Sequence, residues 1–267
     1  MGADIKSLRN RIKSVDSTLH LTRAMGLVAS SKIRRAMEGM KRGREYEQAV
    51  REAIEPLLAS RDCQRSPYMR EGNGDRTCLV VIAGDRGLAG GYNANIFRAV
   101  REYPKADVIP VGKRACDRFK ETVCPAENFG YDQALGLAAD LCRDFYEGKY
   151  DRIGILCTRY HSMLSQEAEI RWIFPLARTE AKSRTGMVFE PDEVSVLDAA
   201  IPEYVAGMLV SAARESFACE VAARRTAMDS AGKNAQQMID ELQLEYNRAR
   251  QGAITQEITE IVAGSGM

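Results

Sequence analysis

The residues of this 267-residue chain best placed to do chemistry lie in a glycine-rich stretch, GDRGLAGGYNAN, that follows an apolar run. Backbone N–H groups in a glycine-rich strand-to-helix turn can hold phosphate. The spacing matches neither GxGxxG nor a GK[ST] loop, and no acidic residue ends a second strand to hold a ribose. The pattern favours a tight turn that needs positive φ angles, with a nucleotide-binding α/β enzyme as the alternative. The turn residues are Gly84, Asp85, Arg86, Gly87, Gly90 and Gly91.

Other constellations that could catalyse a reaction are weak. The histidines, His20 and His161, are far apart, and the seven cysteines are scattered without a CxxC pair. We therefore expect no metal site, no cofactor and no catalytic residue in this chain. Cysteines inside apolar runs, such as Cys78 and Cys157, are typical of core residues in a reducing cytoplasm and not of a disulfide framework.

A basic N-terminal segment is the other candidate site, because Lys and Arg side chains neutralise nucleic-acid phosphates. No aromatic residue interleaves its cations, and no recognition motif accompanies them. The outer face of a coiled coil is the commoner cause of such a pattern, and a basic-helix nucleic-acid binder remains the alternative. The cations are Lys6, Arg9, Arg11, Lys13, Arg23, Lys32, Arg34 and Arg35.

Both terminal segments are patterned as long helices. No proline occurs before Pro56 or after Pro202, so each end could extend on the order of 80–100 Å at about 1.5 Å per residue. Two companion heptad sets in the first segment predict a coiled-coil seam. One set is Ile5, Ile12, Leu19, Gly26, Ile33 and Met40; the other is Leu8, Val15, Thr22, Ala29, Ala36 and Gly43.

The C-terminal segment carries a matching apolar stripe, which slips by one position at Ile254 and continues as Ile258 and Ile261. Residues 1–60 hold 12 Lys/Arg against 7 Asp/Glu, a net of about +5, whereas residues 203–267 hold 6 against 9, a net of about −3. Opposite charge and matching seams predict an antiparallel pair of helices. The stripe before the slip is Ala218, Val221, Met228, Ala235, Ile239, Leu242, Tyr246, Ala249 and Ala253.

The middle of the chain alternates short apolar runs with helical patterns, which predicts a Rossmann-like, mainly parallel sheet. We expect strands at 78–84, 107–112, 152–160 and 169–176, the last two forming an antiparallel hairpin, and helices at 93–103, 113–121 and 132–148. Residues 61–75 are expected to be a linker and residues 177–200 an irregular return path. The predicted domains are an N-terminal helix at 1–60, an α/β domain at 61–202 and a C-terminal helix at 203–267.

Three stretches carry a family resemblance. IKSLRNRIKSVDSTLHLTRAMGLVASSKIRRA from Ile5, DRGLAGGYN from Asp85 and LQLEYNRARQGAITQEITEIVAG from Leu242 resemble the gamma subunit of the rotary F-type ATP synthase. The resemblance extends over essentially the whole chain, in the same order and with the same spacing. It implies the same α/β fold with a long antiparallel coiled coil.

The resemblance also implies a function and a set of partners. A gamma subunit is the non-catalytic rotor of the central stalk and couples ion flow through the membrane sector to ATP synthesis or hydrolysis. Its partners are the alpha and beta subunits of the head, the epsilon subunit and the ring of c subunits. The implied location is the cytoplasmic side of a bacterial cell membrane, peripheral and without a membrane span of its own.

The same resemblance implies which residues contact the head and couple rotation to catalysis. These are Arg23, Met25, Arg224, Arg250, Gln251, Thr255 and Glu257. Gly26 departs from the family pattern, because relatives usually carry a longer residue there, and the ending AGSGM departs from the common alanine-rich tail. Both departures concern packing of the helix tip. Whether protons or sodium ions drive the rotor is not implied by this chain.

Overall fold

The structure is a computed structural model that describes residues 2–72, 74–122, 124–179 and 188–264. The chain divides into two compact units, one made of Met1–Ser30 with Arg224–Met267 and the other of Ser31–Ala223. Two long helices, α1 (Gly2–Ala59) and α5 (Glu193–Gly264), contribute residues to both units. The predicted long terminal helices are therefore present.

In the first unit, α1 and α5 form an antiparallel pair. Gly26 lies beside Met228, and Gly232 lies beside Leu19 and Thr22. The buried α1 positions in this unit are Leu19, Thr22, Gly26 and Ala29, all of them members of the predicted heptad sets. The seam therefore follows the 3–4 spacing of the sequence, as expected for a coiled coil.

The second unit contains a four-stranded sheet in the order β2-β1-β3-β4. Its strands are β1 (Thr77–Ile82), β2 (Asp107–Val111), β3 (Arg152–Tyr160) and β4 (Gln166–Phe174). β1 pairs in parallel with β2 and with β3, and β3 pairs antiparallel with β4. The predicted mainly parallel sheet and the predicted hairpin are both confirmed.

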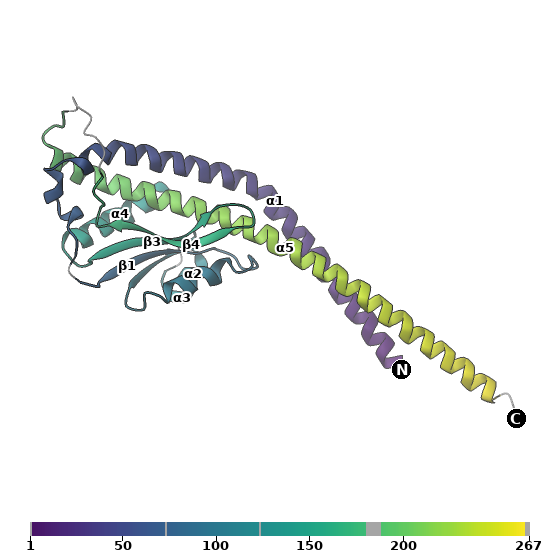
Figure 1. Cartoon of the computed structure of the whole chain (residues 1–267). Helices are drawn as coiled ribbons and strands as arrows, with labels where there is room; N and C mark the ends of the chain where they lie inside the picture. The colour runs from purple at the N-terminus through teal and green to yellow at the C-terminus, as the bar shows by residue number, and fades with distance from the viewer. Residues whose placement is uncertain (1, 73, 123, 180–187, 265–267) are drawn as a thin grey trace. The chain divides into compact units, whose positions relative to one another are not determined.

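Both faces of this sheet are covered by helices (Figure 1). Cys78, Val80 and Ile82 of β1 belong to a large core that includes residues of α4 (Tyr131–Tyr146), α1 and α5. Leu79 and Val81 face the other way into a smaller core with α2 (Tyr92–Val100) and α3 (Lys113–Phe119). Alternation along one strand thus builds two cores, as the period of two requires.

The predicted linker at 61–75 is more ordered than its composition indicates. It contains two short 3₁₀ turns, η1 (Cys63–Arg65) and η2 (Pro67–Met69). The ring of Tyr68 stacks on Phe174 with centroids 5.4 Å apart and is buried. Burial of this one aromatic side chain fixes the segment against the core.

The predicted irregular path at 177–200 is wrong at its end, because α5 begins at Glu193. The Asp192 carboxylate accepts hydrogen bonds from the backbone N–H groups of Val194 (3.0 Å) and Ser195 (2.9 Å), which is how an aspartate starts a helix. Pro202 lies inside the helix although it removes one backbone hydrogen bond. Burial of Leu197 and Ile201 on the core face offsets that loss. Residues 180–187 of the predicted path lie outside the described residues.

Within the described residues, one helix, α5, contains a stretch long and apolar enough to cross a membrane by length and composition. That stretch is 67% buried inside the protein. Its apolar side chains are those of a core helix, which packs against the sheet and α1.

Candidate functional site

The glycine-rich turn between β1 and α2 is held by Asp85. Its carboxylate accepts three backbone hydrogen bonds of 2.9 Å, from the N–H groups of Lys113, Ala126 and Glu127. A carboxylate bonded to several backbone amides is a strong local anchor. Asp85 therefore joins the turn to the start of α3 and to the segment before α4.

The turn's own amides are occupied by a second carboxylate, that of the buried Glu220 on α5. Glu220 accepts from the N–H groups of Asp85 and Arg86, both at 3.3 Å. A Cβ on Gly84 would lie 2.7 Å from the Glu220 carboxyl carbon, so a glycine is needed for this approach. Because a protein carboxylate stands where a phosphate would have to bind, the geometry disfavours the nucleotide-enzyme alternative.

The remaining turn residues have different local roles. Positive φ angles occur at Leu88 (60°) and Gly90 (57°), so the predicted turn conformation is present but only one glycine uses it. Gly91 precedes the first residue of α2, and Gly87 lies against the Arg114 side chain. Arg86 lies 4.0 Å from the Glu127 carboxylate. The turn is a structural junction in which glycines provide space.

The predicted head-contact residues fall into two groups along the first unit. Arg23, Met25 and Arg224 lie near the middle of the paired helices, where Arg23 donates to the Gln236 side-chain oxygen at 3.3 Å. The second group is exposed and begins about 40 Å beyond Arg224 along α5, at about 1.5 Å per residue. It consists of Arg250, Gln251, Thr255 and Glu257. The structure therefore does not gather the seven residues into one cluster.

A residue that the sequence reasoning missed, Arg225, crosses from α5 to α1. Its guanidinium donates to the Gly26 carbonyl at 3.1 Å and to the Ser30 hydroxyl, and it pairs with Asp229 at 2.9 Å. A Cβ at Gly26 would make only ordinary contacts, at 3.6 Å to Met228 and 3.8 Å to Asp229. The small residues of the heptad were the available signal, since small residues permit close approach of a polar group.

The end of α5 presents an unpaired apolar stripe. Continuing the register set by Gly26 and Met228 brings Gly2 level with residue 252, so Ile254 and the residues after it extend beyond the described part of α1 (Figure 1). Ile254, Ile258 and Ile261 are 45%, 57% and 69% exposed. The predicted slip of the stripe thus falls at the level of the first described residues of α1. Contiguous exposed apolar side chains are typical of a protein contact surface.

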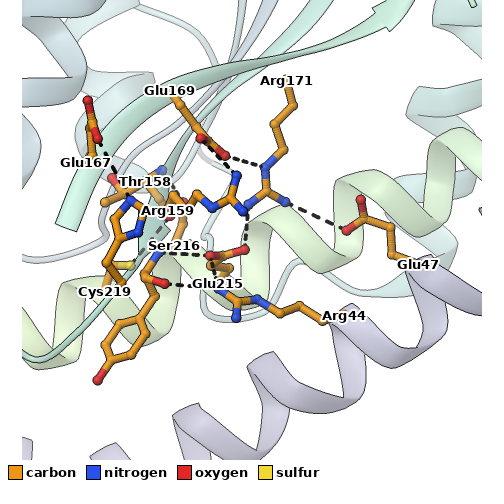
Figure 2. A network of polar contacts seen from close by, with 12 residues as sticks. Arg44, Glu47, Thr158, Arg159, Glu167, Glu169, Arg171, Glu215, Ser216 and Cys219 are labelled. Atoms are coloured by element: carbon orange, nitrogen blue, oxygen red, sulfur yellow. Dashed lines mark hydrogen bonds and ion pairs between the residues drawn. The ribbon is translucent and has the colours of Figure 1, made fainter. Parts of the chain in front are cut away.

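In the second unit, a cluster of ion pairs ties the β3–β4 hairpin to both helices (Figure 2). The Glu215 side chain on α5 is 0% exposed and accepts from Arg44 of α1 at 2.5 Å and from Arg171 of β4 at 2.6 Å. The backbone N–H of Tyr160 donates to it at 2.8 Å. Arg171 also pairs with Glu169 at 3.0 Å and lies 3.7 Å from Glu47. The sequence showed no sign of this cluster.

The fold is that of known ATP synthase rotors. A chain in the cryo-EM structure of the rotor of the Euglena gracilis mitochondrial ATP synthase matches with a TM-score of 0.68 and 22% identity, over 95% of this chain and 100% of that chain. A chain of the central stalk and c-ring of the Tetrahymena thermophila enzyme matches with a TM-score of 0.61 and 21% identity, over 79% of this chain and 99% of that chain. The chain therefore shares its fold with these two central-stalk chains.

Sequence relatives narrow this class. Residues 4–266 match the family described as ATP synthase. The chain is 38% identical to the ATP synthase gamma chain of Moorella thermoacetica and 34% identical to that of Geotalea uraniireducens, over 98% of each chain in both cases. It is 35% identical to the sodium ion specific gamma chain of Acetobacterium woodii, over 99% of both chains. The chain belongs to the gamma chains of the ATP synthase family: it is a rotor subunit of an F-type enzyme and is not itself catalytic.

Proposed function

We propose that this rotor subunit couples rotation to catalysis through the exposed end of α5, which contacts the alpha and beta subunits of the head. The observation that carries the proposal is the stripe of Ile254, Ile258 and Ile261, which lies along one face of the end of α5 and is 45%, 57% and 69% exposed. An exposed stripe of this kind is stabilised by burial against another protein. Membership of a rotor family supports the head as that protein.

The polar contacts of this surface are Arg250, Gln251, Thr255 and Glu257, with Arg23, Met25 and Arg224 forming a second contact level on the paired helices. The second level begins about 40 Å beyond Arg224 along α5, and two separated levels suit a rotor that contacts the head at more than one height. Torque is transmitted because the rotor contacts each catalytic subunit differently, so turning it changes their relative conformational free energies.

The second unit, with its α/β core, is proposed to contact the epsilon subunit and the c-ring, on the cytoplasmic side of a bacterial membrane. The bacterial relatives support this location. The chain's own contribution there is a rigid body, because Asp85, Glu220 and Glu215 fasten its loops and hairpin to α1 and α5.

Co-expression with cognate alpha and beta subunits tests this proposal. A defined complex with ATPase activity is expected, and failure to assemble would overturn it. Arg224→Ala and Glu257→Ala are expected to lower assembly or coupled turnover several-fold while leaving the isolated chain folded. Arg101→Ala and Glu102→Ala, which change exposed residues just after α2, are the matched controls. Equal losses in test and control variants would contradict the contact assignment.

A further inference from the structure

We propose that a basic cavity in the second unit binds a nucleoside polyphosphate. The cavity has a volume of about 790 Å³, within the range of small-molecule sites. It lies between one face of α1, the segment at 126–130 that precedes α4, and α5. It adjoins the glycine-rich turn, because Asp85 of the turn accepts hydrogen bonds from Ala126 and Glu127, which line the cavity, but the turn's own amides are occupied by Glu220. A ligand in the cavity goes beyond the rotor function.

Cations from two helices line this cavity. Lys32, Arg35 and Arg42 lie on one face of α1, since they are spaced three and seven residues apart, and Arg214 comes from α5. Lys32 is neutralised by Glu127 at 2.8 Å. Within the described parts of the chain, no carboxylate pairs with any of the three arginines. The cavity therefore keeps an excess of about three positive charges.

Gly39 leaves space between the cations of the cavity, and packing restrains one of these cations, Arg214. A Cβ on Gly39 would meet nothing within 4 Å, so space exists between the cations. The aliphatic stem of Arg214 passes over Gly43, where a Cβ would lie 3.3 Å from its Cδ. This packing restrains Arg214 before any ligand binds, which lowers the entropy lost on binding.

The side-chain chemistry of the cavity favours a nucleoside polyphosphate as the ligand. Guanidinium groups donate paired hydrogen bonds that fit phosphate oxygens. Arg35 and Arg42 are about 10 Å apart along the helix axis, so a ligand that engages both needs more than one phosphate. Phe129 and Phe217 supply an apolar wall for a base. Acidic peptide side chains would match the charges but would leave this aromatic wall without a role.

Binding is tested by titration calorimetry of the full chain with ATP, ADP, AMP and tripolyphosphate. ATP and ADP are expected to bind at least tenfold more tightly than AMP, and ATP more tightly than tripolyphosphate. Replacing Arg35, Arg42 and Arg214 together by alanine should weaken ATP binding at least tenfold. Arg101→Ala is the control, because this exposed residue after α2 lies outside the cavity, and it should bind ATP as the unchanged chain does.

Several results would overturn the proposal. ATP binding that survives the triple substitution would place the site elsewhere, and so would binding lost in Arg101→Ala. Tripolyphosphate binding as tightly as ATP would remove the nucleoside, and an acidic peptide binding where ATP does not would make the cavity a protein contact. If circular dichroism shows the triple alanine variant unfolded, the triple lysine variant replaces it, and undiminished ATP affinity there would contradict the paired guanidinium contacts. Assembly with alpha and beta subunits is measured separately, so failure of either proposal is distinguishable.

Discussion

At the scale of single residues, three acidic side chains hold the second unit together. Asp85, Glu215 and Glu220 each accept hydrogen bonds from groups far away in the chain, and Glu215 and Glu220 are buried. A buried carboxylate is tolerated only when it is paired and hydrogen-bonded, because the cost of removing it from water is several kcal/mol. These residues fasten separate elements at particular points, which apolar contacts alone would not do.

Glu215 carries the clearest prediction at this scale. Replacing it by glutamine leaves Arg44 and Arg171 without their shared carboxylate, so the free energy of unfolding should fall by about 3–5 kcal/mol. Urea denaturation measures this loss. Glu167→Gln is the control, because Glu167 is 78% exposed and its contact with His161 should contribute under about 1 kcal/mol. Similar losses in both variants would contradict the special role of the buried site.

The same residue predicts a dependence of stability on pH. Burial alone would raise the pKa of Glu215, but hydrogen bonds from Arg44, the Tyr160 amide and Arg171 outweigh it and lower the pKa below the ordinary value of 4.5. The resulting stabilisation is present above pH 4.5 and is lost as the pH falls through the lowered pKa. Denaturation at a series of acidic pH values should show this loss in the unchanged chain and a smaller one in Glu215→Gln. Identical slopes would refute the assignment.

At the scale of elements, the small residues in the seam between α1 and α5 lower the intrinsic stability of the helix and let the two helices pack closely. A glycine inside a helix costs about 1 kcal/mol relative to alanine. Gly26 carries this cost, and its backbone carbonyl accepts a hydrogen bond from Arg225. The seam also contains Thr22 and Ala29 in this region, so its apolar burial is smaller than that of a leucine-rich coil. The pair is thus held by polar crossing contacts as well as by apolar packing.

Gly26→Ala tests this balance. The added Cβ would lie 3.6 Å from the Met228 Cβ and 3.8 Å from the Asp229 carboxylate oxygen, which are ordinary contacts, and the backbone carbonyl is retained. We expect the isolated chain to gain about 0.5–1 kcal/mol, seen as a higher melting temperature by circular dichroism. Gly43→Ala is the contrast, because its Cβ would lie 3.3 Å from the Ser211 Cα, a backbone atom with little freedom to move. A gain at Gly43 equal to that at Gly26 would show that packing space does not decide the outcome.

At the scale of the whole molecule, the two long helices differ in charge and in how completely they are covered. The basic N-terminal segment and the acidic C-terminal segment attract each other, with little gained per exposed pair. The end of α5 lies past the register of α1 and exposes three isoleucines. This exposed end is the surface that we propose contacts another subunit, as coupling requires.

Replacing Ile254, Ile258 and Ile261 together by serine should separate stability from assembly. The unfolding free energy of the isolated chain is expected to change by less than about 0.5 kcal/mol, because these side chains are exposed. Yield of the complex with alpha and beta subunits, measured by size-exclusion chromatography, should fall several-fold. Ile239→Ser, at a buried seam position, should instead destabilise the isolated chain by about 2–4 kcal/mol. Normal assembly of the triple variant would sink the proposed head contact.

Local pattern was enough to predict the long helices, their heptad seam, the four strands and the antiparallel hairpin. Apolar residues recur every 3.5 residues in the coiled-coil helices and every two residues in a strand. Such periods involve only neighbouring positions in the sequence, so they can be recognised without knowing the fold. The slip at Ile254 was readable for the same reason. Asp192, which precedes the first residue of α5, is a local signal too, but Pro202 obscures it because a proline usually marks a helix boundary.

Only the tertiary structure determines which distant residues contact the glycine-rich turn and Glu215. Glu220 reaches the amide of Asp85 across 135 positions of sequence, and Arg44 reaches Glu215 across 171. No periodicity links residues so far apart, because their partners are selected by how α1, α5 and the sheet pack. By its sequence alone, the glycine-rich stretch could bind a phosphate. It is a structural junction because the buried carboxylate of Glu220, on α5, occupies its amides.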